Sequence, residues 1–598
     1  MFKRVPFTPG NLTDHRWGTD DILTGGPSKT VLIGDAGGSM FDFAKGGNDT
    51  FNGPTFPEEN PIHYTFYGDA VGSMFDFAQG GDDTFAFKPT LSIYEISIAY
   101  GDAGGDMSGH AKGGNDVFSS TDVAFCTFYG DAGGNMSGYA QGGNDALAGG
   151  SNDGTDLFYG DAGGSMSGHA KGGDDSFSGS DAGGGNTFYG DAGGDMSGYA
   201  QGGNDSFKGG AYVPYFSSFG SNTAYGDAGG NMSGHAHGGN DTYTGGFASI
   251  NYFYGDAGGD MSDYAQGGDD NYTGSLFFPN HSSNIFYGDA GGNMSGHAKG
   301  GDDSFGGSES GGSTFYGDAG GNMSGYAKGG NDTLRAAPFA GETFYGDAGG
   351  SMSGHAKGGD DIFSGAGNSS TFYGDAGGDM SGDAKGGNDT ATNDESFYPA
   401  SITFYGDAGG DMSGHAKGGD DILTGSSHNF LDAPISNTAF GDAQSMSGFA
   451  KGGDDTLVGG DCLGPGSVSN ILFGDASSLS GFAEGGDDTL FAGTAAPNGM
   501  VSNVMWGDGS LLGGAHGGRD LFVFRDDGLL TVGTQNTIED FSQRQHDRIE
   551  FSDVAGVDSF HDLVITHAGA DTVITAGADQ VTLHNFTGSL TAHDFLFV

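Results

Sequence analysis

One sequence repeat, present along almost the whole chain, constrains the fold more than any other feature. A representative copy reads AYGDAGGNMSGHAHGGNDTY, from Ala224 to Tyr243. It holds two Gly-flanked aspartates fourteen residues apart, and the first of them recurs sixteen times at intervals of 28 to 36 residues. The second aspartate follows fourteen residues later in the first thirteen repeats, thirteen later in the next two and twelve later in the last. A constant core separated by variable inserts is typical of a solenoid whose loops emerge on one side.

The repeated aspartates form two sets, which we name the first row and the second row. First-row residues lie in a GD pair: Asp35, Asp69, Asp102, Asp131, Asp161, Asp191, Asp227, Asp256, Asp289, Asp318, Asp347, Asp375, Asp407, Asp442, Asp475 and Asp508. Second-row residues end a GGND, GGDD or GGRD turn: Asp49, Asp83, Asp116, Asp145, Asp175, Asp205, Asp241, Asp270, Asp303, Asp332, Asp361, Asp389, Asp421, Asp455, Asp488 and Asp520. All thirty-two are candidate metal ligands.

The residues between the two aspartates predict a strand, a turn and a second strand. In NMSGHAK, Met, Gly and Ala alternate with Ser, His and Lys, which is the period of a β-strand. The following GGND predicts a turn in which Gly supplies positive φ, and segments such as DTF predict a short strand with one inward apolar residue. Helical periodicity is absent from these cores. We therefore expect an all-β, right-handed β-solenoid or β-roll of about sixteen coils, with variable loops on one side.

Composition indicates what the aspartates are for. The chain has a formal charge of −58, and its 78 acidic residues are 69 Asp and only nine Glu. A strong Asp bias beside Gly indicates turns that need a short carboxylate, and a bound hard cation such as Ca²⁺ is the ion that takes carboxylate and carbonyl oxygens. The same charge disfavours nucleic acid as a partner. The two cysteines, Cys126 and Cys462, lie in different repeats and indicate no disulfide framework.

Electrostatics leads to the same ion. Stacked coils would place like aspartates about 5 Å apart, where two unit charges repel by roughly 3 kcal/mol at an effective dielectric near 20. One Ca²⁺ per repeat supplies roughly +32 and two supply roughly +64, against the formal −58. The alternative is that each aspartate only hydrogen-bonds its own turn amides, as Asp often does. The cation interpretation predicts a chain that is disordered without Ca²⁺ and folded with it.

These motifs resemble a known family. GGNDTF and GGDDTL are similar to the second half of the glycine-rich nonapeptide of repeats-in-toxin (hemolysin-type) calcium-binding proteins, G-G-x-G-x-D-x-U-x with U a large apolar residue. Gly47, Asn48, Asp49 and Phe51 match its fourth, fifth, sixth and eighth positions, and YGDAGG resembles a variant of the same motif. The resemblance implies a β-roll that binds several Ca²⁺ ions. The chain departs from the family in having Ala-Lys or Ala-Gln before the second turn and long inserts, so one cation per repeat, centred on the second row, is the better fit, and two remain possible.

The end of the chain carries a second resemblance. From about residue 521 the repeat stops, and DLFVF, IEDFSQRQHDRIEFS and HDFLFV resemble the C-terminal region of calcium-repeat proteins exported by type I secretion. The resemblance implies an uncleaved C-terminal export signal, which agrees with an N-terminus that lacks the apolar core of a signal peptide. A cap that protects the edge of the last coil is the compatible alternative. We expect three parts: an N-terminal cap with a partial repeat (1–30), the solenoid (31–520) and a capping and secretion region (521–598).

Two further repeat positions are regular. Fourteen of the seventeen methionines share one position, from Met40 to Met446, and Leu479 replaces them once. This favours a packed core ladder over a Cu(I) site. The outward position of the MSGxAx segment carries Phe, His or Tyr in fourteen of the first fifteen repeats, and His and Tyr alternate across nine repeats. Duplication of a two-repeat block explains the alternation, whereas a transition-metal row is disfavoured because histidines two coils apart cannot share one ion.

The sequence predicts no enzyme. It contains no HExxH or GxSxG motif and leaves no room for a catalytic domain before the repeats, although activity in the inserts stays open. We expect a secreted, extracellular calcium-binding protein, free or associated with the cell surface, with a structural or adhesive role. The alternatives are a self-assembling surface-layer or filament subunit and a protein that binds a glycan or another regular surface, ice among them, through its flat His/Tyr face. The chain has no stretch long and apolar enough for a transmembrane segment.

Overall fold

The computed structural model describes most of the chain. Described are residues 3–4, 7–26, 30–53, 63–87, 96–120, 125–149, 155–179, 185–210, 221–245, 250–274, 284–307, 312–336, 341–365, 369–393, 399–427, 434–525 and 534–598. The variable inserts, where the sequence left room for further activity, lie largely outside these ranges. In the described chain no helix has the length and apolar character needed to cross a membrane.

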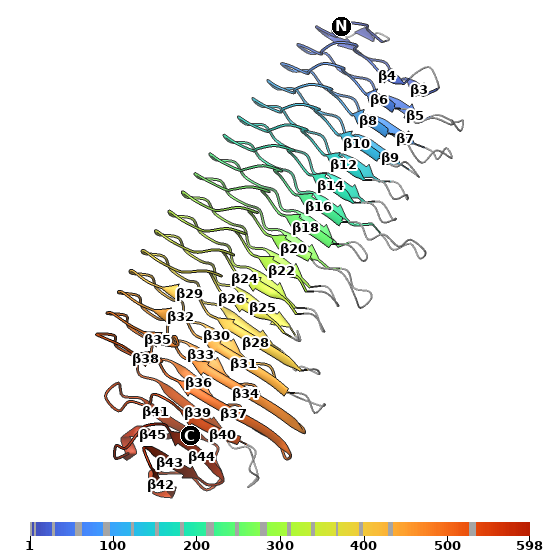
Figure 1. Cartoon of the computed structure of the whole chain (residues 1–598). Helices are drawn as coiled ribbons and strands as arrows, with labels where there is room; N and C mark the ends of the chain where they lie inside the picture. Colours follow the sequence, from blue (N-terminus) through green and yellow to red (C-terminus); the bar gives the residue numbers. More distant parts are fainter. Residues whose placement is uncertain are drawn as a thin grey trace. The chain divides into compact units, whose positions relative to one another are not determined.

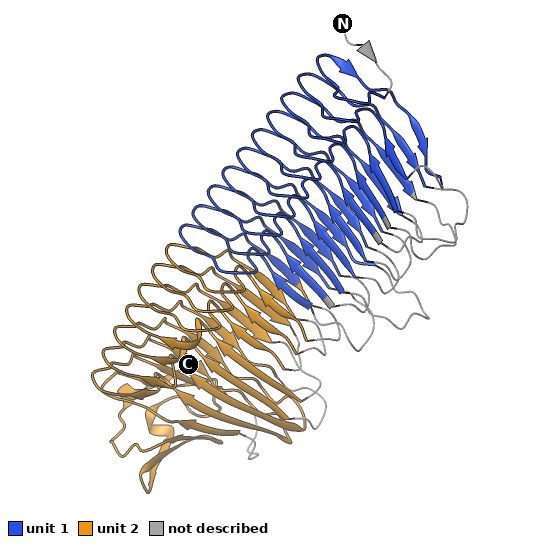
Figure 2. Cartoon of the chain, turned by 45° about the horizontal axis from the view of Figure 1, so that its top comes forward, with its two compact units in different colours: residues 1–305 blue, residues 306–598 orange. Residues whose placement is uncertain are grey.

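The chain is a β-solenoid of stacked parallel coils, as the sequence predicted, with about 13 turns against the sixteen expected. It divides into two compact units, unit 1 (Met1–Phe305) and unit 2 (Gly306–Val598), coloured separately in Figure 2. Each unit is described by itself below. The predicted division at residues 30 and 520 is a different one and stays a prediction.

Unit 1 contains two parallel sheets, which pair coil to coil in register (Figure 1). Sheet 1 consists of the strands that lead into the first-row aspartates: β4 (Val31–Ile33), β6 (His63–Tyr67), β8 (Ile96–Tyr100), β10 (Phe125–Tyr129), β12 (Asp156–Tyr159), β14 (Asn186–Tyr189), β16 (Ser221–Tyr225), β18 (Ile250–Tyr254) and β20 (Asn284–Tyr287). Sheet 2 consists of the strands that follow the second row: β3 (Ile22–Thr24), β5 (Thr50–Asn52), β7 (Thr84–Phe87), β9 (Val117–Ser120), β11 (Ala146–Ala148), β13 (Ser176–Ser178), β15 (Ser206–Lys208), β17 (Thr242–Thr244) and β19 (Asn271–Thr273). A small pair, β1 (Lys3–Arg4) and β2 (Arg16–Trp17), precedes them, and β21 (Ser304–Gly306) lies at the unit boundary.

Unit 2 repeats this arrangement with longer strands near its end. Its sheet 1 strands are β22 (Thr314–Tyr316), β24 (Thr343–Tyr345), β26 (Thr371–Tyr373), β28 (Ala400–Tyr405), β31 (Pro434–Phe440), β34 (Gly466–Phe473), β37 (Gly499–Trp506) and β40 (Thr534–Ile538). Its sheet 2 strands are β23 (Thr333–Arg335), β25 (Ile362–Gly365), β27 (Thr390–Asn393), β30 (Ile422–Thr424), β33 (Thr456–Val458), β36 (Thr489–Phe491), β39 (Leu521–Arg525), β41 (Arg548–Ser552) and β45 (Phe595–Phe597). Short strands β29 (Ala408–Met412), β32 (Ala443–Met446), β35 (Ser478–Leu479) and β38 (Ser510–Leu511) form a third sheet.

The core lies between sheets 1 and 2. In unit 1, Phe118 of sheet 2 contacts Phe128 of sheet 1, with ring centroids 4.8 Å apart, and equivalent phenylalanines meet in other coils. The methionine ladder closes one end of this core, since every methionine from Met40 to Met446 at that position is at most 1 % exposed. The packed ladder predicted from Met and Leu exchange is therefore confirmed. Cys126 and Cys462 are both buried.

The predicted strand over MSGxAx is wrong. Met and Lys or Gln make isolated parallel bridges to the next coil, and the residues between them form a tight turn. Gly109 and its equivalents have φ of about +72° to +76°, a left-handed conformation that ends a strand and that Gly adopts at little cost. Where Asp replaces this Gly, as at Asp76 and Asp263, φ is still about +60°. The His/Tyr row therefore projects from a turn and not from a flat strand face.

The paired glycines of GGND were also misassigned. Neither appears among the residues with positive φ. They are needed because neighbouring coils approach closely: a Cβ on Gly114 would lie 1.7 Å from the carbonyl oxygen of Gly81 in the preceding coil, and a Cβ on Gly113 would lie 1.4 Å from Oδ1 of Asp131 in the next coil. The sequence pattern correctly predicts that glycine is required at these positions, but the reason is close approach between coils and not positive φ.

Residues 521–598 add different topology within unit 2. Strands β39, β41 and β45 continue sheet 2, and β40 continues sheet 1. An antiparallel meander of β42 (Leu563–Ala568), β43 (Asp571–Ala576) and β44 (Asp579–Leu583) then pairs with β40 through β44. Two 3₁₀ turns, η1 (Phe560–Asp562) and η2 (Ala592–Asp594), join these strands. This segment covers the last coil edge.

Candidate functional site: two rows of buried aspartates

All thirty-two predicted ligands are buried, and none is more than 3 % exposed. Each repeat contributes one first-row and one second-row carboxyl group, at the two ends of the segment that connects sheet 1 to sheet 2. Lone buried carboxylates are costly unless they are hydrogen-bonded or paired with a positive charge. The hydrogen-bond partners of the two rows therefore decide what the site can do.

Each second-row carboxyl group accepts one backbone hydrogen bond from the preceding coil. In unit 1 the N–H of Asp116 donates to Oδ1 of Asp145 over 2.6 Å, and the N–H of Asp145 donates to Oδ1 of Asp175 over 2.6 Å. In unit 2 the N–H of Asp421 donates to Oδ1 of Asp455 over 2.7 Å. The alternative interpretation, that these residues bond backbone amides, is thus correct for one oxygen of each carboxyl group.

The other second-row oxygen, Oδ2, is buried without a donor. This holds for Asp49, Asp83, Asp116, Asp145, Asp175, Asp205, Asp241 and Asp270 in unit 1, and for Asp361, Asp389, Asp421, Asp455, Asp488 and Asp520 in unit 2. An unsatisfied buried polar atom costs about 1–3 kcal/mol, and more when it is charged. Native proteins hold few such atoms, so a row of them indicates a missing partner.

The glycine before each first-row aspartate makes room for this oxygen. A Cβ on Gly130 would lie 1.7 Å from Oδ2 of Asp145 and 1.9 Å from the carbonyl oxygen of Gly160 in the next coil. Gly226 has the same relation to Asp241 and to the carbonyl of Gly255. The carboxylate oxygen and a neighbouring backbone carbonyl oxygen therefore converge beside each of these glycines. Two hard oxygen donors side by side, with no hydrogen between them, suit a cation.

First-row carboxyl groups follow a related pattern. Oδ2 of Asp69 accepts the N–H of Gly81 over 2.8 Å, while its Oδ1 has no N–H or O–H donor. The carboxyl of Asp69 is placed to hydrogen-bond those of Asp35 and Asp102 in the adjoining coils. Two carboxylates cannot hydrogen-bond each other unless one is protonated. Every step along this row therefore requires a proton or a cation.

The pKa values express this requirement. Burial, and after it the Asp35 carboxylate, raises the pKa of Asp49 from 3.8 to about 8. Burial likewise raises the pKa of Asp227 to about 7, with repulsion from Asp241 adding to it. Within the metal-free fold, neutral carboxyl groups are thus favoured over the charge that aspartate carries in water. A bound divalent cation would reverse this preference.

The structure extends both rows beyond the residues that the sequence identified. The N–H of Asp21 donates to Asp49 over 2.6 Å, so residues 7–24 form a further coil, with Leu12 in the methionine position. At the other end, Asp547 accepts the N–H of Asp520 over 3.3 Å and Asp540 accepts three N–H groups, from Gly507 to Gly509. The segment HDRIEF, with Asp followed two residues later by a large apolar residue, is the signal that could have found Asp547.

The outward aromatic row presents ring edges to solvent. In unit 1 the rings from Phe43 to His297 stack on one another with centroids 4.8–5.1 Å apart and planes within 15°. The side chains are about half exposed, as at Tyr139 with 52 %. Because each ring face is turned toward the next ring, a ligand reaches hydroxyl groups and ring nitrogens at the edges.

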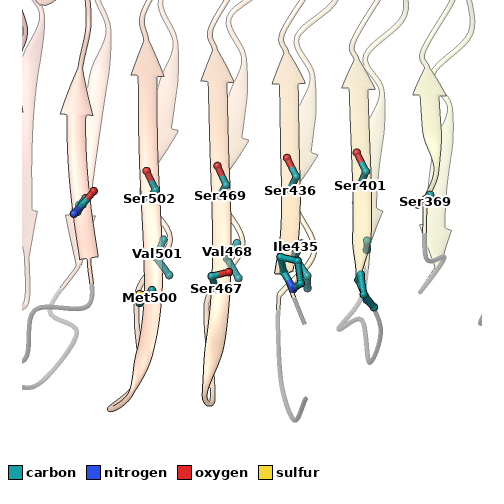
Figure 3. Close-up of a pocket in the computed structure, with 14 residues that line it drawn as sticks. Ser369, Ser401, Ile435, Ser436, Ser467, Val468, Ser469, Met500, Val501 and Ser502 are labelled. Carbon is teal, nitrogen blue, oxygen red and sulfur yellow. The ribbon is translucent and has the colours of Figure 1, made fainter. Parts of the chain in front are cut away.

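Unit 2 also contains a groove of about 620 Å³ over strands β28, β31, β34 and β37. Figure 3 shows Ser401, Ser436, Ser469 and Ser502, one from each strand, in a row that crosses the four strands. Val468 and Val501 lie nearby on two of the same strands. No acid, base or thiol is among its lining residues. We assign this groove no role.

The residues of the two rows fit a hard cation in chemistry, with one restriction. The donors are all oxygen, buried and unsatisfied, as hard cations require. However, the described residues hold no group of three or more His, Cys, Asp or Glu side chains that could bind a metal ion. A cation here would therefore take one or two carboxylates and complete its shell with backbone carbonyl oxygens.

Comparison with known proteins adds no assignment, because no family model, curated protein or solved structure matches the chain.

Proposed function

We propose that this protein is a calcium-binding extracellular scaffold whose coils fold when Ca²⁺ occupies the aspartate rows. The observation that carries the proposal is the row of buried second-row Oδ2 atoms without a donor, which at positions such as Asp145, Asp241 and Asp421 lie beside a backbone carbonyl oxygen of the next coil. The resemblance to repeats-in-toxin motifs supports the same ion.

In this proposal the second-row Oδ2 and the adjoining glycine carbonyl hold the cation, for example Asp145 with Gly160. When bound, Ca²⁺ supplies positive charge that replaces the missing hydrogen-bond donor. The Oδ1 atom stays bonded to the backbone N–H of the preceding coil and keeps the carboxyl group oriented. Burial, and after it the second-row carboxylate of Asp116, raises the pKa of the first-row Asp102, so a cation beside Asp116 would also relieve the repulsion at Asp102.

The overall charge supports more than one ion. The formal charge is −58, and one Ca²⁺ per repeat supplies about half of the positive charge needed for neutrality, whereas two supply slightly more than all of it. Because a preformed site is absent from the unfolded chain, the free energy of calcium binding would become free energy of folding.

Far-UV circular dichroism tests the proposal directly. The full chain at pH 8 is compared in excess chelator, in calcium and in magnesium at equal ionic strength. We expect a β-sheet spectrum in calcium, an unfolded spectrum in chelator and a weaker effect of magnesium, which demands a stricter octahedral shell. A native β-sheet spectrum in chelator at this pH would contradict calcium-dependent folding.

The extracellular role is part of the same proposal. A chain that needs calcium to fold stays unfolded in a low-calcium cytoplasm and can be threaded through an export channel. Residues 521–598, which resemble the terminal region of type I substrates, would then direct export. A reporter protein joined ahead of residues 521–598 should reach the medium of a cell with a type I exporter, and retention inside the cell would oppose this assignment.

A further inference from the structure

The basic residues of this acidic chain are concentrated in one repeat position. Nine of the twenty Lys and Arg residues stand two positions after the outward aromatic residue. In unit 2 they occupy five consecutive coils, which we name the lysine row: Lys328, Lys357, Lys385, Lys417 and Lys451. Each is bridged in parallel register to the next, so their Cα atoms are about 4.8 Å apart and the row is about 20 Å long.

The lysine row is exposed and largely without acidic partners. All five side chains are exposed, and within the described residues Lys451 alone forms an ion pair, with Glu484 of the next coil. The carboxylate of Asp383, two positions before Lys385, lies 3.6 Å from Nδ1 of His355. Like charges about 5 Å apart repel by about 1 kcal/mol even in water. The chain has 78 acidic residues, yet within the described residues only one ion pair involves a lysine of this row.

The fold does not require these charges. In unit 1 the same position alternates between Lys and Gln: Gln79, Lys112, Gln141, Lys171 and Gln201 make the same parallel bridges in consecutive coils. Gln therefore satisfies the backbone and the packing equally well. A continuous positive charge in unit 2 needs a reason outside the fold.

The neighbouring groups indicate the chemistry of a partner. Beside the lysine row lie the edges of Tyr326 and His355, whose rings stack with centroids 4.7 Å apart, and they offer hydrogen bonds to hydroxyl groups. Stacked ring faces leave little room for nucleobases, which bind single strands by stacking.

We propose that the lysine row binds a linear acidic polysaccharide whose sugars carry uronic acid carboxylates. Successive lysines pair with successive carboxylates, while the ring edges hydrogen-bond the sugar hydroxyls. This inference names a partner for the extracellular scaffold and rests on the proposed function only in requiring the folded coils.

Fluorescence polarisation of an end-labelled oligogalacturonate of about ten sugars, at trace concentration in calcium, tests the inference. We expect binding that weakens between about 50 mM and about 500 mM NaCl, as exposed ion pairs do. The variant K328Q/K357Q/K385Q/K417Q/K451Q, which carries the residue that unit 1 already uses, should bind at least about tenfold more weakly. The matched Lys→Arg variant should keep its affinity. The methyl-esterified oligomer, with the same sugars and no charge, should bind poorly.

Three results would overturn the inference: equal affinity of the Gln variant, equal affinity of the methyl ester, or equally tight binding of single-stranded DNA of the same charge, which would make the row a general polyanion site. Circular dichroism of the same samples in calcium and in chelator separates this outcome from the proposed function. A chain that is folded in chelator contradicts calcium-dependent folding and leaves the polysaccharide result standing.

Discussion

Unit 2 stacks two kinds of short polar side chain in its interior, one per coil, and their hydrogen bonding differs. In the asparagine ladder, Oδ1 of Asn470 accepts from the N–H of Gly460 and from Asn437, while its Nδ2 donates to the carbonyl of Gly460 and to Asn503, all within 3.0 Å. In the second aspartate row, Oδ1 of Asp455 accepts one N–H and Oδ2 has no donor.

The difference follows from the two functional groups. An amide has donors and an acceptor, so identical amides stacked at the coil spacing satisfy one another indefinitely. An ionised carboxylate only accepts, so identical carboxylates stacked at the same spacing need something positive between them. The asparagine ladder therefore satisfies its own hydrogen bonds, whereas the aspartate rows need protons or cations from the solvent.

The largest effect is expected from pH in the absence of calcium, because it acts on every coil. The pKa of Asp49 is raised by burial to about 8 and that of Asp227 to about 7, from an ordinary 3.8. The folded chain thus holds protons that the unfolded chain has lost, so stability is fully present below pH 3.8 and is lost as pH rises toward 8. In chelator, the β-sheet circular dichroism should be stronger at about pH 5.5 than at about pH 8. In calcium this trend should reverse, and a pH-independent spectrum in chelator would contradict the account.

Converting part of the aspartate row into an asparagine ladder should have the next largest effect. In D389N/D421N/D455N/D488N, each new Nδ2 can donate to a glycine carbonyl. For example, Asp421 Oδ2 and the Gly441 carbonyl oxygen lie close together, because a Cβ on Gly406 would lie 1.9 Å from the first and 1.7 Å from the second. Because the variant removes four buried carboxylate oxygens that lack a hydrogen-bond donor, it should raise the free energy of unfolding in chelator by about 4 kcal/mol or more. Urea titration measures it, and equilibrium dialysis should count fewer bound calcium ions. An unchanged ion count would oppose the assignment of the second row.

The converse substitution should destabilise without creating a calcium site. Asn470→Asp removes two donated hydrogen bonds and leaves the Gly460 carbonyl and Asn503 Oδ1 facing a carboxylate. We expect a loss of about 3 kcal/mol in urea titrations with calcium present. The control Asn388→Asp makes the same change at an exposed position and should cost less than about 0.5 kcal/mol. A gain of bound calcium in the Asn470 variant would show that a carboxylate alone suffices.

The smallest effect is expected at Asp540, which continues the first row and is fully hydrogen-bonded. Its two oxygens accept the N–H groups of Gly507, Asp508 and Gly509 at 2.9–3.1 Å. Asp540→Asn replaces one accepting oxygen by an NH₂ group and should therefore lose part of these hydrogen bonds. We expect the free energy of unfolding in urea titration to fall by about 1 kcal/mol, with no change in calcium stoichiometry. A drop in bound calcium would mean that orphaned oxygens are not what distinguishes binding positions.

Much of the fold could be predicted from the sequence because one repeat was copied many times. The Gly-flanked aspartates, the methionine position and the aromatic residues before GD recur at fixed offsets, and each occupies a fixed place in the coil. The calcium assignment was not deducible from the pattern alone, since the same aspartates bond backbone amides through one oxygen. That the other oxygen is buried without a hydrogen-bond donor follows only from the three-dimensional structure.

The errors have identifiable causes. Alternation in NMSGHAK reads as a strand, but Gly109 and its equivalents adopt positive φ and turn the chain there. The paired glycines serve close approach between coils, which no single-repeat pattern can show. The asparagine ladder was not predicted although Asn470 and Asn503 stand at the same offset before their GD pairs, because Asn is as typical of a turn as of a buried ladder.

The most direct test of the central claim is the anomalous signal of calcium in crystals grown with that ion. The account predicts peaks within bonding distance of second-row Oδ2 atoms and the adjoining glycine carbonyls, such as Asp145 with Gly160, repeated from coil to coil. Crystals in plentiful calcium that show no such peaks, with the carboxyl groups sharing protons instead, would contradict it.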